Sequence, residues 1–410
     1  MNDISHDLSD IHELMSLIKR PLVETTTSTL RYLKTSQSKY PDNYCVVKYD
    51  KTIMSDDLST TYGLCRSIVV ENSSGKVLSF APPKSISTET FMQLYPNKSH
   101  KIVAEEFVEG TMINVFYDEV NNHWDFATKS TVGAHNSFYR GTKTFNQMFV
   151  EACGASQLSL DTLDPRYCYS FVLQHPENRI VVPFSKSTLY IVAVYMIDQT
   201  ETTLQVHRVE PNSIFDWAKT GVLFPKRYEW TNYSELIEKY ASPNTSYEIV
   251  GVVIKNLNSG YRCKIRNPIY EEVRQLKGNQ SKMQFQYLFL RTSGKIAEFL
   301  KFYPEMKKDF SVYRDQVHLF TNTLFQNYIS CYIKKEKPLS EFSNQYRTHM
   351  FHLHQHYIND LREQKLYITS GEVIRYVNSL APALLMHSLN YNLNQHKISK
   401  VISDNSIASV

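Results

Sequence analysis

Residues 101–130 read KIVAEEFVEGTMINVFYDEVNNHWDFATKS, and this stretch gives the strongest indication of how the chain folds. The run 112–117 is rich in β-branched and aromatic residues, which favours a β-strand directly after the Glu109-Gly110 pair. Between Lys101 and Lys129 there is no lysine or arginine. The stretch therefore predicts a strand that follows an acid and a glycine, with no amine supplied by this part of the chain.

The length and composition of the chain indicate two packed domains. Its 410 residues exceed what one compact core usually holds, and 42% of them are hydrophobic. Residues 283–410 contain 15 of the 45 Lys+Arg and 10 of the 41 Asp+Glu, so this part has a local excess of five positive charges. We expect domains at 1–280 and 281–410, the second of them basic, which suits nucleic-acid binding as well as ordinary solvated helices.

From about residue 44 to residue 264 the sequence predicts antiparallel strands. Short β-branched and aromatic runs are separated by turn residues there. The clearest runs are 67–70, 112–117, 179–182, 189–197 and 250–254, and residues 72–75 form a predicted hairpin turn.

Helices are expected at both ends of the chain. The first covers residues 8–20, with Ser9 or Asp10 as its cap. Its apolar face consists of Ile11, Leu14, Met15 and Ile18. After about residue 278, apolar residues recur every three or four positions over 313–328 and 342–361, and residues 369–372 have the form of a capping box. The expected fold class is therefore α+β, with antiparallel sheets followed by an all-α C-terminal domain.

The cysteines and the hydropathy restrict the surroundings of the protein. Six cysteines are scattered without paired spacing, which is neither a disulfide framework nor a zinc motif. A reducing compartment is expected. The most apolar run, residues 189–197, is about half the length that a membrane helix needs. We expect a buried strand there and no membrane partner.

Several sequence blocks follow one another in an order that resembles a known family. They are GLCRSIVVENSSGKVLSFAPPK at 63–84, EFVEGTMINVFYD at 106–118, WDFATKS at 124–130, SFVLQHPENRIVV at 170–182, YEIVGVVIKN at 247–256 and YRCKIRNP at 261–268. Together they resemble the RNA ligases of the phage tRNA-repair type, in the covalent nucleotidyltransferase superfamily. They are most similar to putative RNA ligases of large cytoplasmic DNA viruses, the asfarvirus group among them. The resemblance implies a ligase-like nucleotidyltransferase domain followed by a helical domain that helps to select the RNA.

The resemblance also implies that the usual chemistry is missing. In that family ATP adenylates a lysine, and the adenylyl group then activates an RNA 5′-phosphate. Phe107 stands at the position of that lysine, and a phenyl ring cannot form the phosphoramidate. Glu109 stands at the following acid, while Val172 and Val250 stand where the family has glutamates that orient the nucleotide and hold metal. Glu248, two residues before Val250, is a possible substitute acid.

The basic positions of the family are retained. They are Arg66, Lys84, Lys129, Lys264 and Arg266, which match residues that contact the nucleotide or its phosphates. A pocket that loses carboxylates and keeps cations should bind a phosphate chain, and no metal site is expected. Phe107 either stacks on a base or fills the space of the lysine.

Three functions follow from this pattern. The first is a degenerate RNA ligase that binds RNA, tRNA or RNA ends among its candidates, without joining strands. The second is an active ligase whose lysine is relocated to Lys84, Lys101 or Lys129, and only this alternative needs ATP and Mg²⁺. The third is a scaffold in a viral transcription or RNA-processing complex. Each places the protein in the host cytoplasm, in a viral factory or in the virion.

Overall fold

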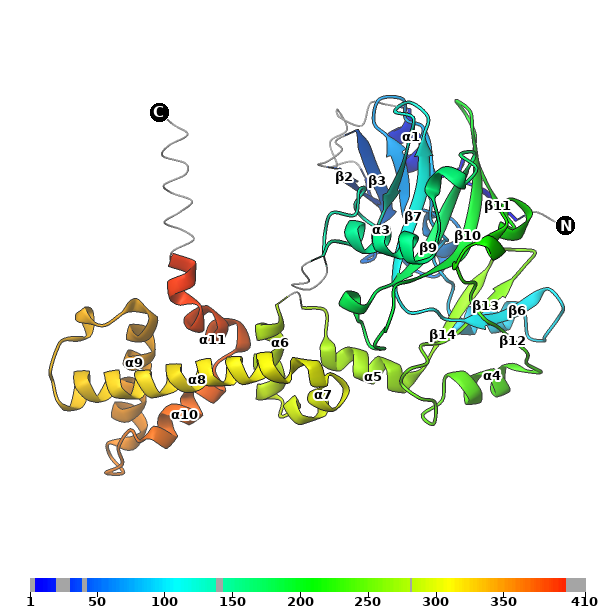
Figure 1. Ribbon diagram of the computed structural model, residues 1–410. Coiled ribbons are helices and arrows are strands. Elements are labelled where there is room, and N and C mark those ends of the chain that lie inside the picture. The colour runs from blue at the N-terminus through cyan, green and yellow to red at the C-terminus, as the bar shows by residue number, and fades with distance from the viewer. Residues whose placement is uncertain (1–3, 20–29, 39–42, 138–142, 281, 396–410) are drawn as a thin grey trace, which may run out of the picture. The chain divides into compact units, whose positions relative to one another are not determined.

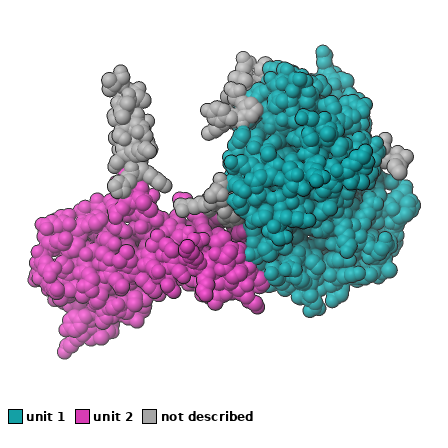
Figure 2. Space-filling view, viewed as in Figure 1, with its two compact units in different colours: residues 1–274 teal, residues 275–410 magenta. Residues whose placement is uncertain are grey.

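The chain divides into two compact units. The computed structural model describes residues 4–19, 30–38, 43–137, 143–280 and 282–395. Its units are Met1–Arg274 and Gln275–Val410 (Figure 2). Helix α5 (Pro268–Lys277) contains the division between them, and the boundary expected at 280 lies just beyond that helix.

Antiparallel sheets form the framework of the first unit (Figure 1). One has the strand order β1-β11-β10-β9-β7-β8, made of Ser5–Asp7, Leu204–Val209, Thr188–Gln199, Tyr167–Gln174, Thr111–Asp118 and His123–Ala127. A second has the order β12-β6-β13-β14, made of Arg227–Tyr228, Ile102–Glu106, Gly251–Asn256 and Arg262–Arg266. A third has the order β2-β3-β4-β5, made of Leu33–Gln37, Tyr44–Tyr49, Ile68–Glu71 and Val77–Phe80. The α+β class with antiparallel sheets is confirmed.

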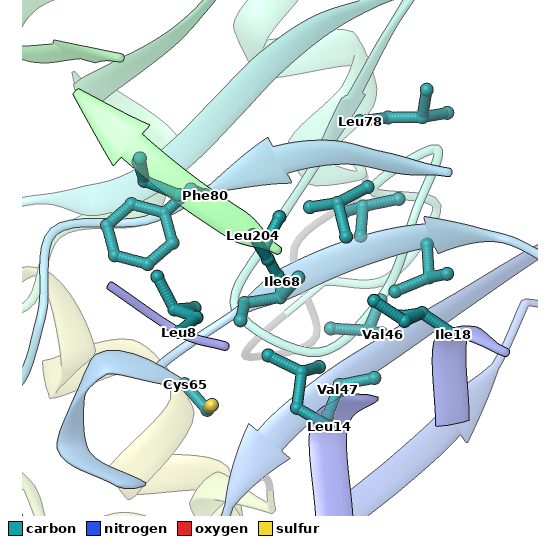
Figure 3. Close-up of a cluster of buried hydrophobic side chains, with 14 of the residues drawn as sticks. Leu8, Leu14, Ile18, Val46, Val47, Cys65, Ile68, Leu78, Phe80 and Leu204 are labelled. Atoms are coloured by element: carbon teal, nitrogen blue, oxygen red, sulfur yellow. The ribbon is translucent and has the colours of Figure 1, made fainter. Parts of the chain in front are cut away.

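The N-terminal helix is shorter than the sequence predicted. Helix α1 covers His12–Ile18, and its four predicted apolar residues pack against the third sheet in a common core with Val46, Val47 and Ile68 (Figure 3). Residues 8–11 precede the helix and connect it to β1, whose backbone pairs with β11. The predicted cap is wrong: the N-cap residue is Ile11, and the Ser9 hydroxyl accepts a hydrogen bond from Leu204 N at 2.9 Å.

Most of the predicted strands are confirmed, and one is not. The runs near 67–70, 112–117, 189–197 and 250–254 became β4, β7, β10 and β13. The predicted turn joins β4 to β5, and Gly75 supplies its positive φ of 70°. Residues 179–182 form no strand, because the N–H groups of Val181 and Val182 donate to the carboxylate of Glu109 instead of to a neighbouring strand.

Further helices of the first unit follow α1 along the chain. Helix α2 covers Thr88–Leu94, α3 covers Phe145–Ala155 and α4 covers Tyr233–Tyr240. Helix α3 lies against β9 and β10, where Phe149 approaches Phe171 with 6.2 Å between ring centroids (Figure 1). Helix α4 packs against β13.

The described residues of the second unit form helices and connecting loops, with no strand among them. Its α-helices are α6 (Met283–Thr292), α7 (Ile296–Phe302), α8 (Lys307–Tyr328), α9 (Asn344–His356), α10 (Ser370–Ser379) and α11 (Pro382–Leu389). The helical spacing predicted over 313–328 is confirmed by α8, which buries Val317, Phe320, Leu324 and Tyr328. The Thr369 side chain caps α10 by accepting from Glu372 N at 3.3 Å. Among the described helices, none combines the length and the apolar composition that a bilayer crossing requires.

The core beneath α3 should be the most sensitive part of the first unit. Phe171 is fully buried between Phe149 and Trp217, so Phe171→Ala should lower the free energy of unfolding by about 3–5 kcal/mol. All three tryptophans, Trp124, Trp217 and Trp230, lie in this unit. Tryptophan fluorescence during urea unfolding therefore follows this unit selectively. The control Val120→Ala, at a side chain that is 71% exposed, should change the free energy of unfolding by less than about 0.5 kcal/mol. A Phe171→Ala loss as small as that of the control would contradict the packing described.

Candidate functional site

The sheet β12-β6-β13-β14 has two unlike faces. Side chains alternate between the faces of a strand, so residues at every second position share one face. On one face Val252, Ile254 and Cys263 enter a core with Phe91 and Trp230. On the other face the cross-strand partners are Glu105, Val253 and Lys264 in one row, and Val103, Lys255 and Arg262 in the next. The second face is therefore the polar one.

This polar face forms the floor of a pocket of about 170 Å³. The opposite wall is apolar and comes from the six-stranded sheet, where Met112 of β7 and Val172 of β9 are direct partners. Arg66, which precedes β4, also lines the pocket. The pocket therefore combines cations on its floor with an apolar wall, a composition that suits a small anionic ligand.

The Phe107 ring lies close to two basic side chains. Its N–H donates to Gly251 O at 3.4 Å, and Gly251 is the cross-strand partner of Arg266. Gly251 has a φ of 135°, and a Cβ there would lie 2.1 Å from Ile265 O. Because Gly251 lies between Phe107 and Arg266 and has no side chain, the Phe107 ring reaches β14. The Lys264 amine lies 4.6 Å and the Arg266 guanidinium 5.5 Å from the ring centroid. The Phe107 ring therefore contacts two basic side chains. Neither of the roles expected for Phe107, stacking on a base or filling the space of a lysine, included this contact.

Two guanidinium groups meet at one carbonyl oxygen. Arg66 Nη1 donates to Pro82 O at 3.3 Å, and Arg262 Nη2 donates to the same oxygen at 3.1 Å. Among the described residues, Arg262 Nε has no hydrogen-bond partner. Burial and the charge of Arg66 lower the pKa of Arg262 to about 10, and burial also lowers the pKa of Arg66. Like charges held this closely create a strong local positive potential.

Two lysines on the floor differ in their charge balance. Lys255 forms an ion pair with Glu105, yet burial lowers its pKa to about 8. Burial and the nearby charges of Arg262, Arg66, Arg266 and Lys255 lower the pKa of Lys264 to about 6. The Lys264 amine is therefore mostly neutral at pH 7, which makes it a nucleophile.

The structure groups some of the predicted cations and separates others. Arg66 and Lys264 line the pocket, and Arg266 flanks Phe107. Lys84 lines a neighbouring cavity of about 200 Å³, where it donates to Ser59 Oγ at 2.8 Å and lies 3.5 Å from Asp56. Arg262 lines both cavities. Lys129 lies over the Tyr49 ring at 4.9 Å, outside the pocket lining, and burial lowers its pKa to about 8.

The predicted acidic positions do not supply carboxylates to the pocket. Val172 lines it, whereas Val250 is buried just before β13 and outside the pocket lining. Glu248 is exposed in a turn before β13, so it does not take the place of the acid missing at Val250. The Glu109 carboxylate accepts from the N–H groups of Val181 and Val182 at 2.9 and 3.2 Å. Proximity to Glu109 contributes, after burial, to a raised pKa of Tyr270.

Sequence reasoning missed Arg262, Lys255 and Glu105. A usable signal existed for Arg262, because Arg262, Lys264 and Arg266 occupy alternate positions of one strand and so share a face. Lys255 follows an apolar run, where the sequence alone does not show that the lysine is buried. The ion pair between Lys255 and Glu105 joins two strands 150 residues apart in the chain.

The lowered pKa of Lys264 makes stability depend on pH in a defined direction. Between pH 6 and pH 10.5 the unfolded chain holds more protons on this lysine than the folded chain does. Burying the Lys264 amine therefore lowers the free energy of unfolding most at and below pH 6. This loss becomes smaller as the pH rises toward 10.5. Replacement by Met removes the loss. Lys264→Met should stabilise the first unit more at pH 6 than at pH 9, by a difference above about 1 kcal/mol.

Urea unfolding followed by tryptophan fluorescence at the two pH values measures this difference. The matched control is Lys219→Met, at a side chain 81% exposed, which should show no such dependence. An equal effect of Lys264→Met at both pH values would mean that the amine is charged in the folded protein.

Comparison with known proteins gives one related sequence and a set of weak structural likenesses. No family model matches the chain. An RNA ligase of Rhodothermus phage RM378 is 22% identical over 285 residues, which cover 61% of this chain and 64% of that protein. This chain thus spans less than two thirds of the relative's length.

Solved structures of Naegleria gruberi RNA ligase, one with PPi and a variant with ATP and Mn, match 48% of this chain and 59% of theirs. Their TM-scores are 0.34 and 0.33 at 13% and 10% identity, too low to carry an argument. The chain is therefore similar in sequence to a phage RNA ligase.

Proposed function

We propose that this protein is an RNA-ligase-like protein that binds RNA through its phosphates and does not join RNA strands. Residues 1–280 would form the ligase-like domain and residues 281–410 a helical, basic domain. One observation supports the proposal above the others: the Arg66 and Arg262 guanidinium groups converge on Pro82 O in a pocket where Phe107 replaces an amine.

Charge is the reason that a phosphate suits this pocket. Arginine pairs recognise phosphate oxygens through parallel N–H donors, and Arg262 Nε is a donor without a partner among the described residues. The Lys255–Glu105 pair is internally balanced, so the two guanidinium groups remain to attract an anion. A 5′-phosphorylated RNA end, from tRNA or another RNA, carries such an anion.

More than one substituted position supports the proposal that the protein does not join RNA strands. Phe107 offers no amine, and Val172 and Val250 offer no carboxylates. In the described part of the chain, no group of three or more His, Cys, Asp or Glu residues is placed to hold a metal ion. The pocket residues fit the phosphates of a nucleotide such as ATP, but the acids that would hold its divalent cation are missing.

A second candidate function is nucleotidyl transfer from a relocated lysine. Among the lysines first considered, Lys84 and Lys129 lie outside the lining of the Phe107 pocket, and Lys101 is exposed before β6. Lys264 lies beside Phe107, with its amine 4.6 Å from the ring centroid, and this position together with its lowered pKa favours the candidate. Such a lysine must still meet the α-phosphate in line with the leaving group.

The setting that we propose is viral. The related sequence is that of a phage enzyme, and the resemblance of the blocks is to proteins of large cytoplasmic DNA viruses. The protein would act in the host cytoplasm, in the viral factory or in the virion. Transcription or RNA-processing proteins would be its neighbours, and a scaffold without any RNA ligand is the remaining alternative.

Binding of 5′-phosphorylated single-stranded RNA, labelled at its 3′ end, should be steeply salt-dependent. Arg66→Ala should weaken binding about tenfold or more and lower the slope of log affinity against log salt by about one. The preference for a 5′-phosphate over a 5′-hydroxyl should also disappear. Fluorescence anisotropy over a salt series measures all three effects. Lys219→Ala, an exposed cation paired with Asp216, is the control and should leave them unchanged. Absence of binding at low salt would leave the scaffold alternative.

Restoring the lysine should not restore ligation. Phe107→Lys places an amine in the pocket but leaves Val172 and Val250 in place. We expect no joining of RNA ends by this variant with ATP and Mg²⁺ or Mn²⁺, measured by gel electrophoresis beside an active RNA ligase. The unmodified protein, incubated with α-labelled ATP, should carry no acid-labile label. Joining by the variant would show that the two valine positions do not matter, and label on the unmodified protein would favour the relocated lysine.

A further inference from the structure

Lys264 has a reactive amine that RNA binding alone does not require. The amine lies against the Phe107 ring at 4.6 Å, in the pocket that holds Arg66 and Arg262. A lysine that only binds phosphate works best when it is charged, because its attraction to the anion is electrostatic. A neutral amine at this place is suited to forming a covalent bond instead.

We propose that the Lys264 amine forms an imine with the carbonyl carbon of a phosphorylated aldehyde whose phosphate is bound by Arg66 and Arg262. The inference concerns the same pocket as the proposed function and rests on it for phosphate binding. It adds a class of ligand, the aldehyde, and a bond to a named atom, Lys264 Nζ.

The size of the pocket restricts the ligand to a small one. Its 170 Å³ is the space of about six water molecules, and pockets for drug-sized ligands start at about 300 Å³. A short sugar phosphate fits such a space, and so does the last sugar of an RNA chain with its neighbouring phosphate. A whole nucleoside triphosphate exceeds it.

The surroundings keep the amine neutral and limit water. The charged residues around Lys264 are Arg262 and Arg266 on β14, Lys255 on β13, Arg66 before β4, and Glu105 and Glu106 on β6. Glu105 is already paired with Lys255, and the Glu106 carboxylate accepts a hydrogen bond from Lys226 N at 3.2 Å. Burial among these cations lowers the pKa of Lys264 to about 6. Met112, Val172 and Val192 line the pocket on its apolar side and reduce the water that would hydrolyse an imine.

The reaction balances without an added oxidant, reductant or metal. The nitrogen lone pair adds to the carbonyl carbon, and the proton that the nitrogen loses moves to the former carbonyl oxygen. That oxygen then leaves as water, and the C=N bond remains. The ammonium of Lys255, whose pKa is lowered by burial to about 8, can donate the proton that helps the water to leave and recover it afterwards.

The residues present favour a carbonyl over a phosphorus electrophile. Attack at an α-phosphate requires an in-line leaving group and, in this chemistry, carboxylates that hold a divalent cation. The positions of those carboxylates are Val172 and Val250. Addition to an aldehyde requires a neutral amine, a proton donor and room, and the pocket supplies all three.

The test uses the full chain with pyridoxal 5′-phosphate, followed by reduction with sodium borohydride and peptide mapping by mass spectrometry. At pH 7, labelling of Lys264 should exceed that of Lys129 by about tenfold, because a pKa of about 6 leaves ten times more neutral amine than a pKa of about 8. Pyridoxal without its phosphate should label Lys264 less, and inorganic phosphate should compete with the probe.

Two variants control the experiment. Lys264→Arg replaces the amine by a guanidinium that cannot form an imine and should abolish labelling in the pocket, while Lys129→Arg should leave the label on Lys264 unchanged. Tryptophan fluorescence shows whether each variant keeps the folded first unit. Label spread evenly over exposed lysines, label on Lys255 in place of Lys264, or no competition by phosphate would overturn the proposal.

A second probe distinguishes the source of the aldehyde. RNA whose 3′-terminal ribose has been oxidised to the dialdehyde should be trapped on Lys264 by borohydride if the ligand is a chain end. Trapping of pyridoxal phosphate alone would identify a free small aldehyde, and trapping of neither would refute the inference. Salt-dependent binding of unmodified RNA is measured in parallel on the unmodified protein. RNA binding without imine formation would thus refute this inference and leave the proposed function standing.

Discussion

The site depends on one row of residues across three strands. Phe107 directly follows β6, Gly251 begins β13 and Arg266 ends β14, and these residues lie side by side at one edge of the sheet. Gly251, in the middle, has no side chain. Because Gly251 leaves this space open, the Phe107 ring lies among basic side chains instead of packing against a side chain of the neighbouring strand. The next rows add Lys264, then Arg262 with Lys255, on the same face. The alternation of side chains along β13 and β14 therefore decides where the basic residues of these two strands lie.

The opposite face of the same ribbon gives the site its rigidity. Ile254 and Cys263 are fully buried in a core with Phe91 and Trp230. Close packing on that side fixes the direction of the polar side chains on the other. The pocket is electrostatically unbalanced because these side chains cannot turn away from one another. Lys255 pairs with Glu105 and Arg266 pairs with Glu271, whereas the Arg66 and Arg262 guanidinium groups share a carbonyl oxygen.

The sequence predicted local structure better than it predicted the site. Strands such as β7 and β10 follow from β-branched and aromatic runs, and α8 follows from helical spacing, because those patterns act over neighbouring residues. The run 179–182 had the same composition but failed, since its N–H groups are taken by Glu109 from 72 residues earlier. Arg66 and Lys264 were identified through the resemblance to RNA ligases. The partnership of Arg66 with Arg262 was not, because it requires Arg262 to reach the Pro82 carbonyl, 180 positions earlier in the chain.

The shared carbonyl oxygen at Pro82 has a consequence for the life of the protein in a cell. Two guanidinium groups held together without a counter-ion weaken the native state, and an anion that binds there selectively strengthens it. The steady-state amount of this protein would then follow the supply of its ligand, since the unoccupied form opens more often to proteases. A pocket that binds an anion can in this way govern how long its own chain survives.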